Sequence, residues 1–81
     1  MSLQNEMRRV EKTNLEHKAK RLRYEIETLV RTICVNLDTS LKAPENLPIN
    51  DVDSQFDDLK TKWAELNMAL GQISRLQKEL T

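Results

Sequence analysis

The feature that most constrains this chain is a seven-residue repeat of apolar positions in its second half. Two columns share the repeat: Val52, Leu59, Leu66, Ile73 and Leu80 form the first, and Phe56, Trp63, Leu70 and Gln77 the second. Their alternating steps of three and four residues give a period near 3.5, which is typical of coiled-coil helices and unlike the alternation of a strand. The repeat therefore predicts a helix over about 51–80, with Asn50 or Asp51 capping its first amides.

The first half predicts a second long helix, over about 3–37. Its apolar stripe steps by four and three residues through Leu15, Ala19, Leu22, Ile26, Leu29 and Ile33. No proline or glycine precedes Pro44, so nothing in the sequence interrupts this helix. Leu3, Met7 and Val10 follow a frame one residue out of step, which predicts a stutter near the beginning of the helix.

The segment of about 38–50 is polar, contains both prolines and is predicted to be a loop. Two helices of similar length joined by one loop favour an antiparallel arrangement. We therefore expect an all-α fold, a coiled-coil-like two-helix hairpin formed by residues 1–81 as a single domain. The apolar stripes are too wide for one hairpin to cover, so we expect a homodimer that forms a four-helix bundle, with a helix of another protein as the alternative partner.

The predicted helix-interface core combines the stripes of both helices. It consists of Leu15, Ala19, Leu22, Ile26, Leu29, Ile33, Val52, Phe56, Leu59, Trp63, Leu66, Leu70, Ile73 and Leu80. Cys34 lies between Ile33 and Val35 and is expected to be a small buried apolar side chain.

The inventory of reactive side chains argues against an enzyme. The chain has one His, one Cys and one Gly, too few for a catalytic constellation, a zinc site or a phosphate-binding loop. His17, between Glu16 and Lys18, is expected to be an exposed helix residue. We therefore expect no catalytic residues, no metal ligands and no cofactor.

Thirteen basic and thirteen acidic residues give a formal net charge of zero, but the charges are unevenly distributed. The densest basic cluster is Lys18, Lys20, Arg21 and Arg23. Its simplest interpretation is a solvated helix face, and nucleic acid is a disfavoured partner. The alternative is a small nucleic-acid-associated or regulatory protein that uses this cluster as a patch for an anionic partner.

The sequence also bears on the compartment. No apolar run is long enough to cross a membrane, and no hydrophobic region of a signal peptide is present. A single Cys cannot form an internal disulfide. We therefore expect a cytoplasmic protein.

The run from Leu59 through Trp63 to Leu66, followed by Leu70, resembles the last helix of spectrin-type repeats, whose core carries Leu-x-x-x-Trp-x-x-Leu. The segment of about 52–80 is also similar to small bacterial coiled-coil proteins. The resemblance implies that Trp63 packs in the core of a helical bundle. A spectrin-type repeat has three helices, and this sequence predicts two.

Overall fold

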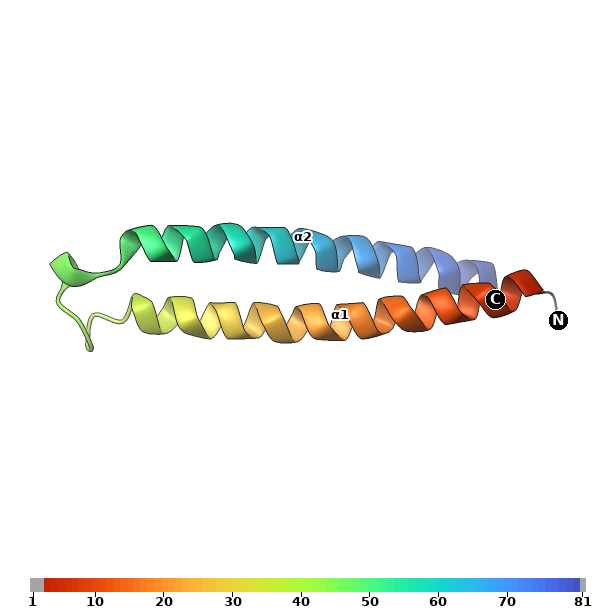
Figure 1. Ribbon diagram of the computed structural model, residues 1–81, viewed down its shortest axis with the longest axis horizontal. Helices are drawn as coiled ribbons and strands as arrows, with labels where there is room; N and C mark the ends of the chain where they lie inside the picture. The colour runs from red at the N-terminus through yellow and green to blue at the C-terminus, as the bar shows by residue number, and fades with distance from the viewer. Residues whose placement is uncertain (1–2, 81) are drawn as a thin grey trace.

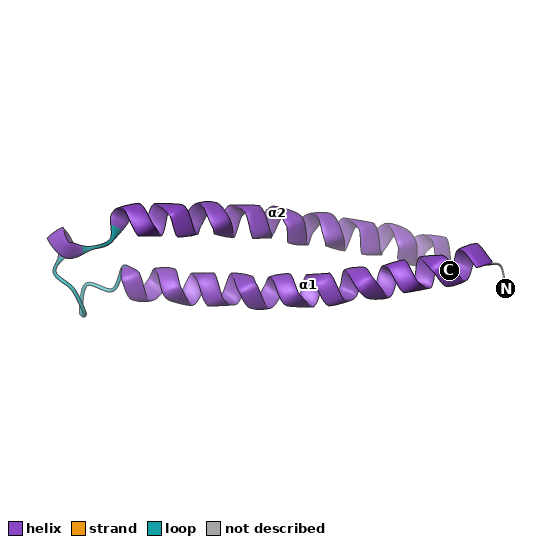
Figure 2. Ribbon diagram, viewed as in Figure 1, coloured by secondary structure: helices purple, strands orange, loops and turns teal. Residues whose placement is uncertain are grey.

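The computed structural model describes residues 3–80 as two long antiparallel helices, α1 (Leu3–Asn36) and α2 (Ile49–Leu80). A short 3-10 helix, η1 (Pro44–Asn46), lies in the connection between them. Figure 2 shows helices and loop but no strand within the described residues. The predicted all-α helical hairpin is therefore confirmed.

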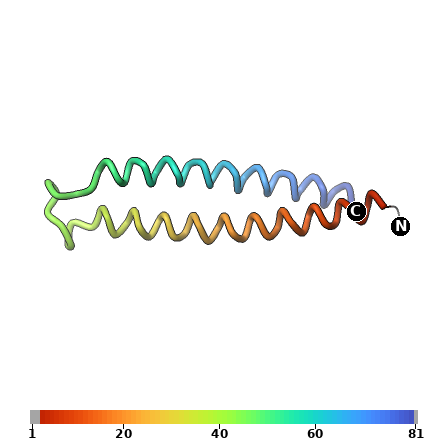
Figure 3. The backbone as a smooth tube through the Cα atoms, in the orientation of Figure 1, coloured from red at the N-terminus to blue at the C-terminus, as the bar shows by residue number. Residues whose placement is uncertain are grey.

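The hairpin is a thin rod. The two helices lie side by side along nearly their whole length, and the start of α1 and the end of α2 lie at the end of the rod opposite the loop (Figures 1 and 3). The Cα atoms span 63 × 16 × 15 Å. A rod made of only two helices has very little interior.

The boundaries of the helices differ slightly from those predicted. Helix α2 begins at Ile49, because the amide of Val52 donates its hydrogen bond to the carbonyl of Pro48, at 2.9 Å. Asn50 and Asp51 therefore lie inside the first turn, and the prediction that one of them caps the helix is wrong. Pro48 suits the position before a helix, because a proline there loses no helical hydrogen bond.

The chain reverses direction through a turn built on Asp38. Its Oδ1 accepts hydrogen bonds from the amide of Ser40 at 2.9 Å and from the Ser40 hydroxyl at 2.6 Å. Both bonds favour the charged carboxylate and hold the pKa of Asp38 below its ordinary value. Of the apolar loop residues, Leu47 is half-buried, whereas Leu41 remains exposed.

The contact between the helices, here called the seam, follows an unbroken three–four spacing on both helices. The seam residues of α1 are Asn5, Arg8, Lys12, Leu15, Ala19, Leu22, Ile26, Leu29, Ile33 and Asn36, and those of α2 are Val52, Gln55, Leu59, Lys62, Leu66, Ala69, Ile73, Leu76 and Leu80; all are buried or half-buried. This spacing is the period of a two-stranded coiled coil.

The predicted stutter in α1 is absent, because the seam keeps its frame through polar residues. Arg8 and Lys12 lie in the seam, while Leu3, Met7 and Val10 are exposed by 71%, 62% and 61%. Long basic side chains fill such positions with their aliphatic stems while the charged ends reach solvent or a partner. Arg8 Nε lies 3.4 Å from the carboxylate of Glu79.

The fully buried side chains of the described residues are Ala19, Leu22, Ala69 and Leu76. Polar contacts from Asn36 to Gln55 and from Glu25 to Lys62 fix the antiparallel register. In this register Ala19 comes level with Ala69, and two methyl groups at one level let the helices approach closely near the middle of the rod.

In α2 the structure selects a different second column for the seam than the sequence predicts. Val52, Leu59, Leu66, Ile73 and Leu80 lie in the seam, but Phe56 and Trp63 are 50% and 62% exposed. Phe56 and Trp63 therefore lie outside the contact between α1 and α2 within the hairpin, and their place in a helix-interface core stays a prediction. Gln55, Lys62, Ala69 and Leu76 take the places facing α1 instead. Gln55 and Lys62 find polar partners there, and Ala69 and Leu76 are buried.

Candidate functional site

The most distinctive surface of the hairpin is an apolar stripe along one side of the seam, here called the apolar flank. Its members are Val30 of α1, Leu37 directly after α1, and Ile49, Phe56, Trp63 and Leu70 of α2; all except Ile49 follow a seam residue by one position. One residue further along a helix is a turn of about 100°. Leu70 is half-buried, and the other five are 41–62% exposed.

The two halves of the apolar flank lie on the same side of the rod. Three acidic residues that precede a seam position by one gather around Lys62 on the opposite side, namely Glu25, Asp58 and Glu65. The hydrogen bond to Glu25 is the main cause that raises the pKa of Lys62, and the negative charges of the three carboxylates add to it. Since these residues of both helices share one side, the residues that follow the seam share the other. The loop half of the rod therefore presents apolar side chains from both helices together.

Phe56 is flanked by a lysine that marks the edge of this surface. The Lys60 ammonium lies 5.6 Å from the centroid of the Phe56 ring and 3.2 Å from a carboxylate oxygen of Asp57. A cation over an aromatic face adds a modest attraction at an exposed site. The aromatic ring remains half exposed, so this contact does not cover the flank.

The opposite side of the seam, here called the charged flank, is held by Glu25 and Lys62. Lys62 Nζ donates a hydrogen bond of 2.6 Å to Glu25 Oε2, and Arg21 Nε lies 3.3 Å from Glu25 Oε1. The hydrogen bond from Lys62 is the main reason that the pKa of Glu25 lies below its ordinary value, with partial desolvation opposing it. The charged flank is thus internally satisfied, in contrast to the apolar flank.

Cys34 is exposed, which contradicts its predicted burial. It lies on the outer face of α1, four residues after Val30 and three before Leu37, and so borders the apolar flank. The apolar residues at the end of α1 do form a broad stripe, but the hairpin leaves Val30, Val35 and Leu37 exposed by 42%, 56% and 41%.

A second apolar surface lies near the start of α1. Leu3, Met7 and Val10 line an open depression of about 870 Å³ together with Leu15 and Lys18. Because all of its lining residues belong to α1, it is a shallow surface along one helix rather than an enclosed pocket.

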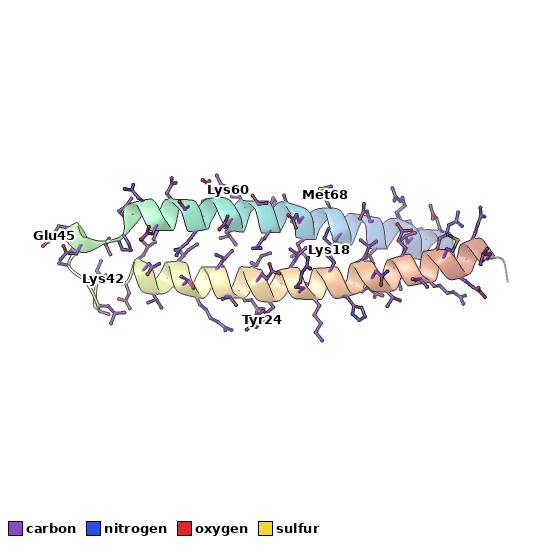
Figure 4. All side chains as sticks on the ribbon, in the orientation of Figure 1. Lys18, Tyr24, Lys42, Glu45, Lys60 and Met68 are labelled. Atoms are coloured by element: carbon purple, nitrogen blue, oxygen red, sulfur yellow. The ribbon has the colours of Figure 1, made fainter. Side chains whose placement is uncertain are left out.

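The basic cluster does not form a single patch. Lys18, Lys20, Arg21 and Arg23 are all exposed, but successive residues of a helix are turned by about 100°, so the four side chains leave α1 on several sides. Arg21 is paired with Glu25. Figure 4 shows Lys18 between the two ribbons, whereas Tyr24 lies on the outer side of α1 and Met68 on that of α2.

Within residues 3–80, no three His, Cys, Asp or Glu side chains come close enough to hold a metal ion. His17 is exposed. No described helix is long and apolar enough to cross a membrane.

Comparison with known proteins gives no relative, since no family of proteins, no curated protein and no solved structure matches this chain.

Sequence reasoning identified Phe56, Trp63 and Leu70 as important apolar residues, but it missed the roles of Gln55 and Lys62 in the seam. The polar residues Asn36 and Glu25 of α1 could have indicated these roles. Asn36 donates a hydrogen bond to Gln55, and Glu25 accepts one from Lys62. Finding those pairs requires the antiparallel register, which the apolar pattern does not specify.

Proposed function

We propose that this chain is a non-enzymatic protein–protein interaction module that assembles by self-association of its helices. The observation that carries the proposal is Trp63, a large aromatic residue that is 62% exposed in the middle of the apolar flank. Contiguous exposed apolar surface on a small protein typically marks an interaction site, and tryptophan is enriched among the residues that dominate interface energetics.

The small core supports the same proposal. With four fully buried side chains among the described residues, a single hairpin has little apolar burial to offset the entropy of ordering two long helices. Burying the apolar flank against another helical surface would supply additional burial. The resemblance of the Trp63 segment to a spectrin-type helix likewise implies a tryptophan packed in a helical core.

Sedimentation velocity at micromolar concentrations tests the proposal, with a matched pair of variants. Trp63→Glu places a charge on the apolar flank, whereas Met68→Glu places the same charge at a residue that is 67% exposed and directed away from α1 (Figure 4). We expect the wild type and Met68→Glu to be dimers, and Trp63→Glu to weaken association by about a hundredfold or more. A compact, stable wild-type monomer at these concentrations would contradict self-association.

Binding of nucleic acid is the less favoured function, because the basic cluster is dispersed around α1 and Arg21 is already paired. A stretch without interleaved aromatic residues, apart from Tyr24, also lacks a stacking surface for single strands. Binding to an oligonucleotide at low salt that is lost when all four basic residues are changed to Glu would favour this alternative over the assembly module.

We further propose that the protein acts in the cytoplasm. The exposed, unpaired thiol of Cys34 suits a reducing compartment, where free cysteines persist.

A further inference from the structure

We propose that two copies of this chain pair through their apolar flanks with both loops at the same end of the bundle, so that α1 of each copy covers α2 of the other. This inference rests on the proposed self-association and adds the surface and the orientation. Its occupant is a second copy of the hairpin, and three observations support it.

The first observation is the position of the apolar flank along the rod. The polar contacts Asn36–Gln55 and Glu25–Lys62 bracket both Val30 and Phe56, so these two side chains lie at nearly the same level, in the loop half. From Val30 toward the start of α1, the corresponding positions are Arg23, beside Trp63, and then Glu16 and Arg9. The flank is therefore apolar near the loop and polar near the chain ends.

The gradient distinguishes the two orientations at full overlap of the rods. With the loops at the same end, Val30 and Leu37 of each copy face Phe56 and Ile49 of the other, because α1 lies over α2 in the register of the hairpin itself, and Arg23 of each copy lies level with Trp63 of the other. With the loops at opposite ends, full overlap places the apolar half against the polar half. The same-end pairing therefore covers the apolar residues beside both loops without a shift of one hairpin along the other.

The second observation is the charge at the two outer edges of the flank. Glu27, three residues before Val30, lies at the α1 edge and is exposed, and Lys60 lies at the α2 edge beside the Phe56 ring. In the same-end pairing, Glu27 of one copy comes level with Lys60 of the other, twice per dimer. An opposite-end pairing centred on the flank instead brings Lys60 toward Lys60 and Glu27 toward Glu27, and like charges at close range oppose association.

The third observation concerns the charged flank on the far side of the seam. Glu25, Lys62 and Arg21 satisfy one another within the hairpin, so that side offers no apolar surface to a second copy. Of the two sides of the seam, the apolar flank is therefore the one that gains from being covered.

The orientation is measured with spin labels at the loop. In a Cys34→Ser background, Thr39→Cys supplies one label in the exposed turn of each copy, and sedimentation first establishes the concentration at which the labelled chain is dimeric. With helix axes about 10 Å apart, the same-end pairing predicts a label-to-label distance below about 30 Å. An opposite-end pairing separates the loops by about 40 Å or more, because each helix rises about 1.5 Å per residue.

Charge reversal tests the contact between the edges independently. Glu27→Lys and Lys60→Glu are each expected to raise the dissociation constant about tenfold, since each creates two like-charged pairs per dimer. The double variant Glu27→Lys/Lys60→Glu is expected to restore the wild-type value to within about threefold. The control is Arg31→Glu on the outer face of α1, which makes the same charge change as Lys60→Glu and should leave association unchanged. Far-UV circular dichroism of each variant verifies that its helices are intact.

The outcomes separate this inference from the function on which it rests. A dimer with loops more than about 40 Å apart, or a double variant that associates no better than the single ones, overturns the same-end pairing but leaves self-association intact. A chain that stays monomeric overturns both.

Discussion

Lys62 of α2 donates a hydrogen bond of 2.6 Å to Glu25 of α1, and it does so from a position in the seam where a coiled coil ordinarily holds an apolar side chain. The neighbouring carboxylates of Asp58 and Glu65 further favour the charged form of the lysine. The pair helps to fix the register of the hairpin, since neither partner has an equivalent one turn away. It also gives the stability of the hairpin a defined dependence on pH.

The stabilising effect of the Glu25–Lys62 pair should be lost at both low and high pH. The pKa of Glu25 is lowered from its ordinary 4.5, so its contribution to stability is present above that value and is lost as the pH falls through the folded-state pKa. The pKa of Lys62 is raised from 10.5, so its contribution is present below that value and is lost as the pH rises through the folded-state pKa. We therefore expect the pair to stabilise the hairpin fully between these two ordinary values.

Thermal unfolding of Glu25→Gln across this range measures the effect. The variant should have a lower Tm than the wild type near neutral pH, and the difference should shrink as the pH falls below 4.5. Glu11→Gln, an exposed residue of the same helix, is the control and should follow the wild type. A Tm difference for Glu25→Gln that stays constant down to strongly acidic pH would contradict the assigned role.

Leu22 is the most completely buried side chain among the described residues, with 1% of its surface exposed. Leu22→Ala removes much of the apolar contact in the centre of the seam and should lower the free energy of unfolding by about 2–3 kcal/mol. Chemical denaturation measures this loss, with Leu3→Ala as the control because Leu3 is 71% exposed on the same helix. Equal effects of the two substitutions would show that the seam does not carry the stability of the fold.

Gly71 lies on the outer face of α2, and a methyl group added there would meet no atom within 4 Å. Gly71→Ala should therefore stabilise the helix by about 0.5–1 kcal/mol, by restricting the unfolded chain. This corresponds to a rise in Tm of several degrees for a domain of this size. Ala64→Gly, one heptad earlier on the same outer face, should lower Tm by a similar amount, and a destabilised Gly71→Ala would reveal a close neighbour at this glycine in the assembled protein.

Trp63 is the single tryptophan and reports directly on the apolar flank. Its fluorescence emission should shift to shorter wavelength as the protein is concentrated and the indole leaves water. Met68→Glu should show the same shift, because its side chain lies away from the flank. An emission maximum that is unchanged over the range in which sedimentation detects dimerisation would exclude Trp63 from the interface.

The course of the chain could be predicted from the sequence because strong local signals determine it. A long stretch without proline or glycine specified α1, and the two prolines of the 38–48 segment marked the connection. Which face of α2 meets α1 was harder to predict. The apolar stripe of α2 is three columns wide, and the central column forms a heptad pattern with either of its neighbours. The polar residues of α1 decided between them, because Asn36 and Glu25 form hydrogen bonds with Gln55 and Lys62.

For the candidate site, the sequence revealed the excess of apolar surface but not its location. The hairpin resolves that excess into a flank containing Phe56 and Trp63 and a separate surface around Leu3, Met7 and Val10. The structure disperses the basic cluster that the sequence brings together. Lys20 and Arg21 are adjacent in sequence, but their side chains leave the helix on different sides.

The antiparallel register has a consequence for how the hairpin forms. The Asn36–Gln55 contact joins residues 19 apart, the Glu25–Lys62 contact joins residues 37 apart, and the Arg8–Glu79 contact joins residues near opposite ends of the chain. Closing a loop costs more entropy as the loop lengthens. Folding is therefore favoured to begin beside the turn at Asp38 and to proceed like a zipper toward the termini, whose polar seam positions Arg8 and Lys12 close last and open first.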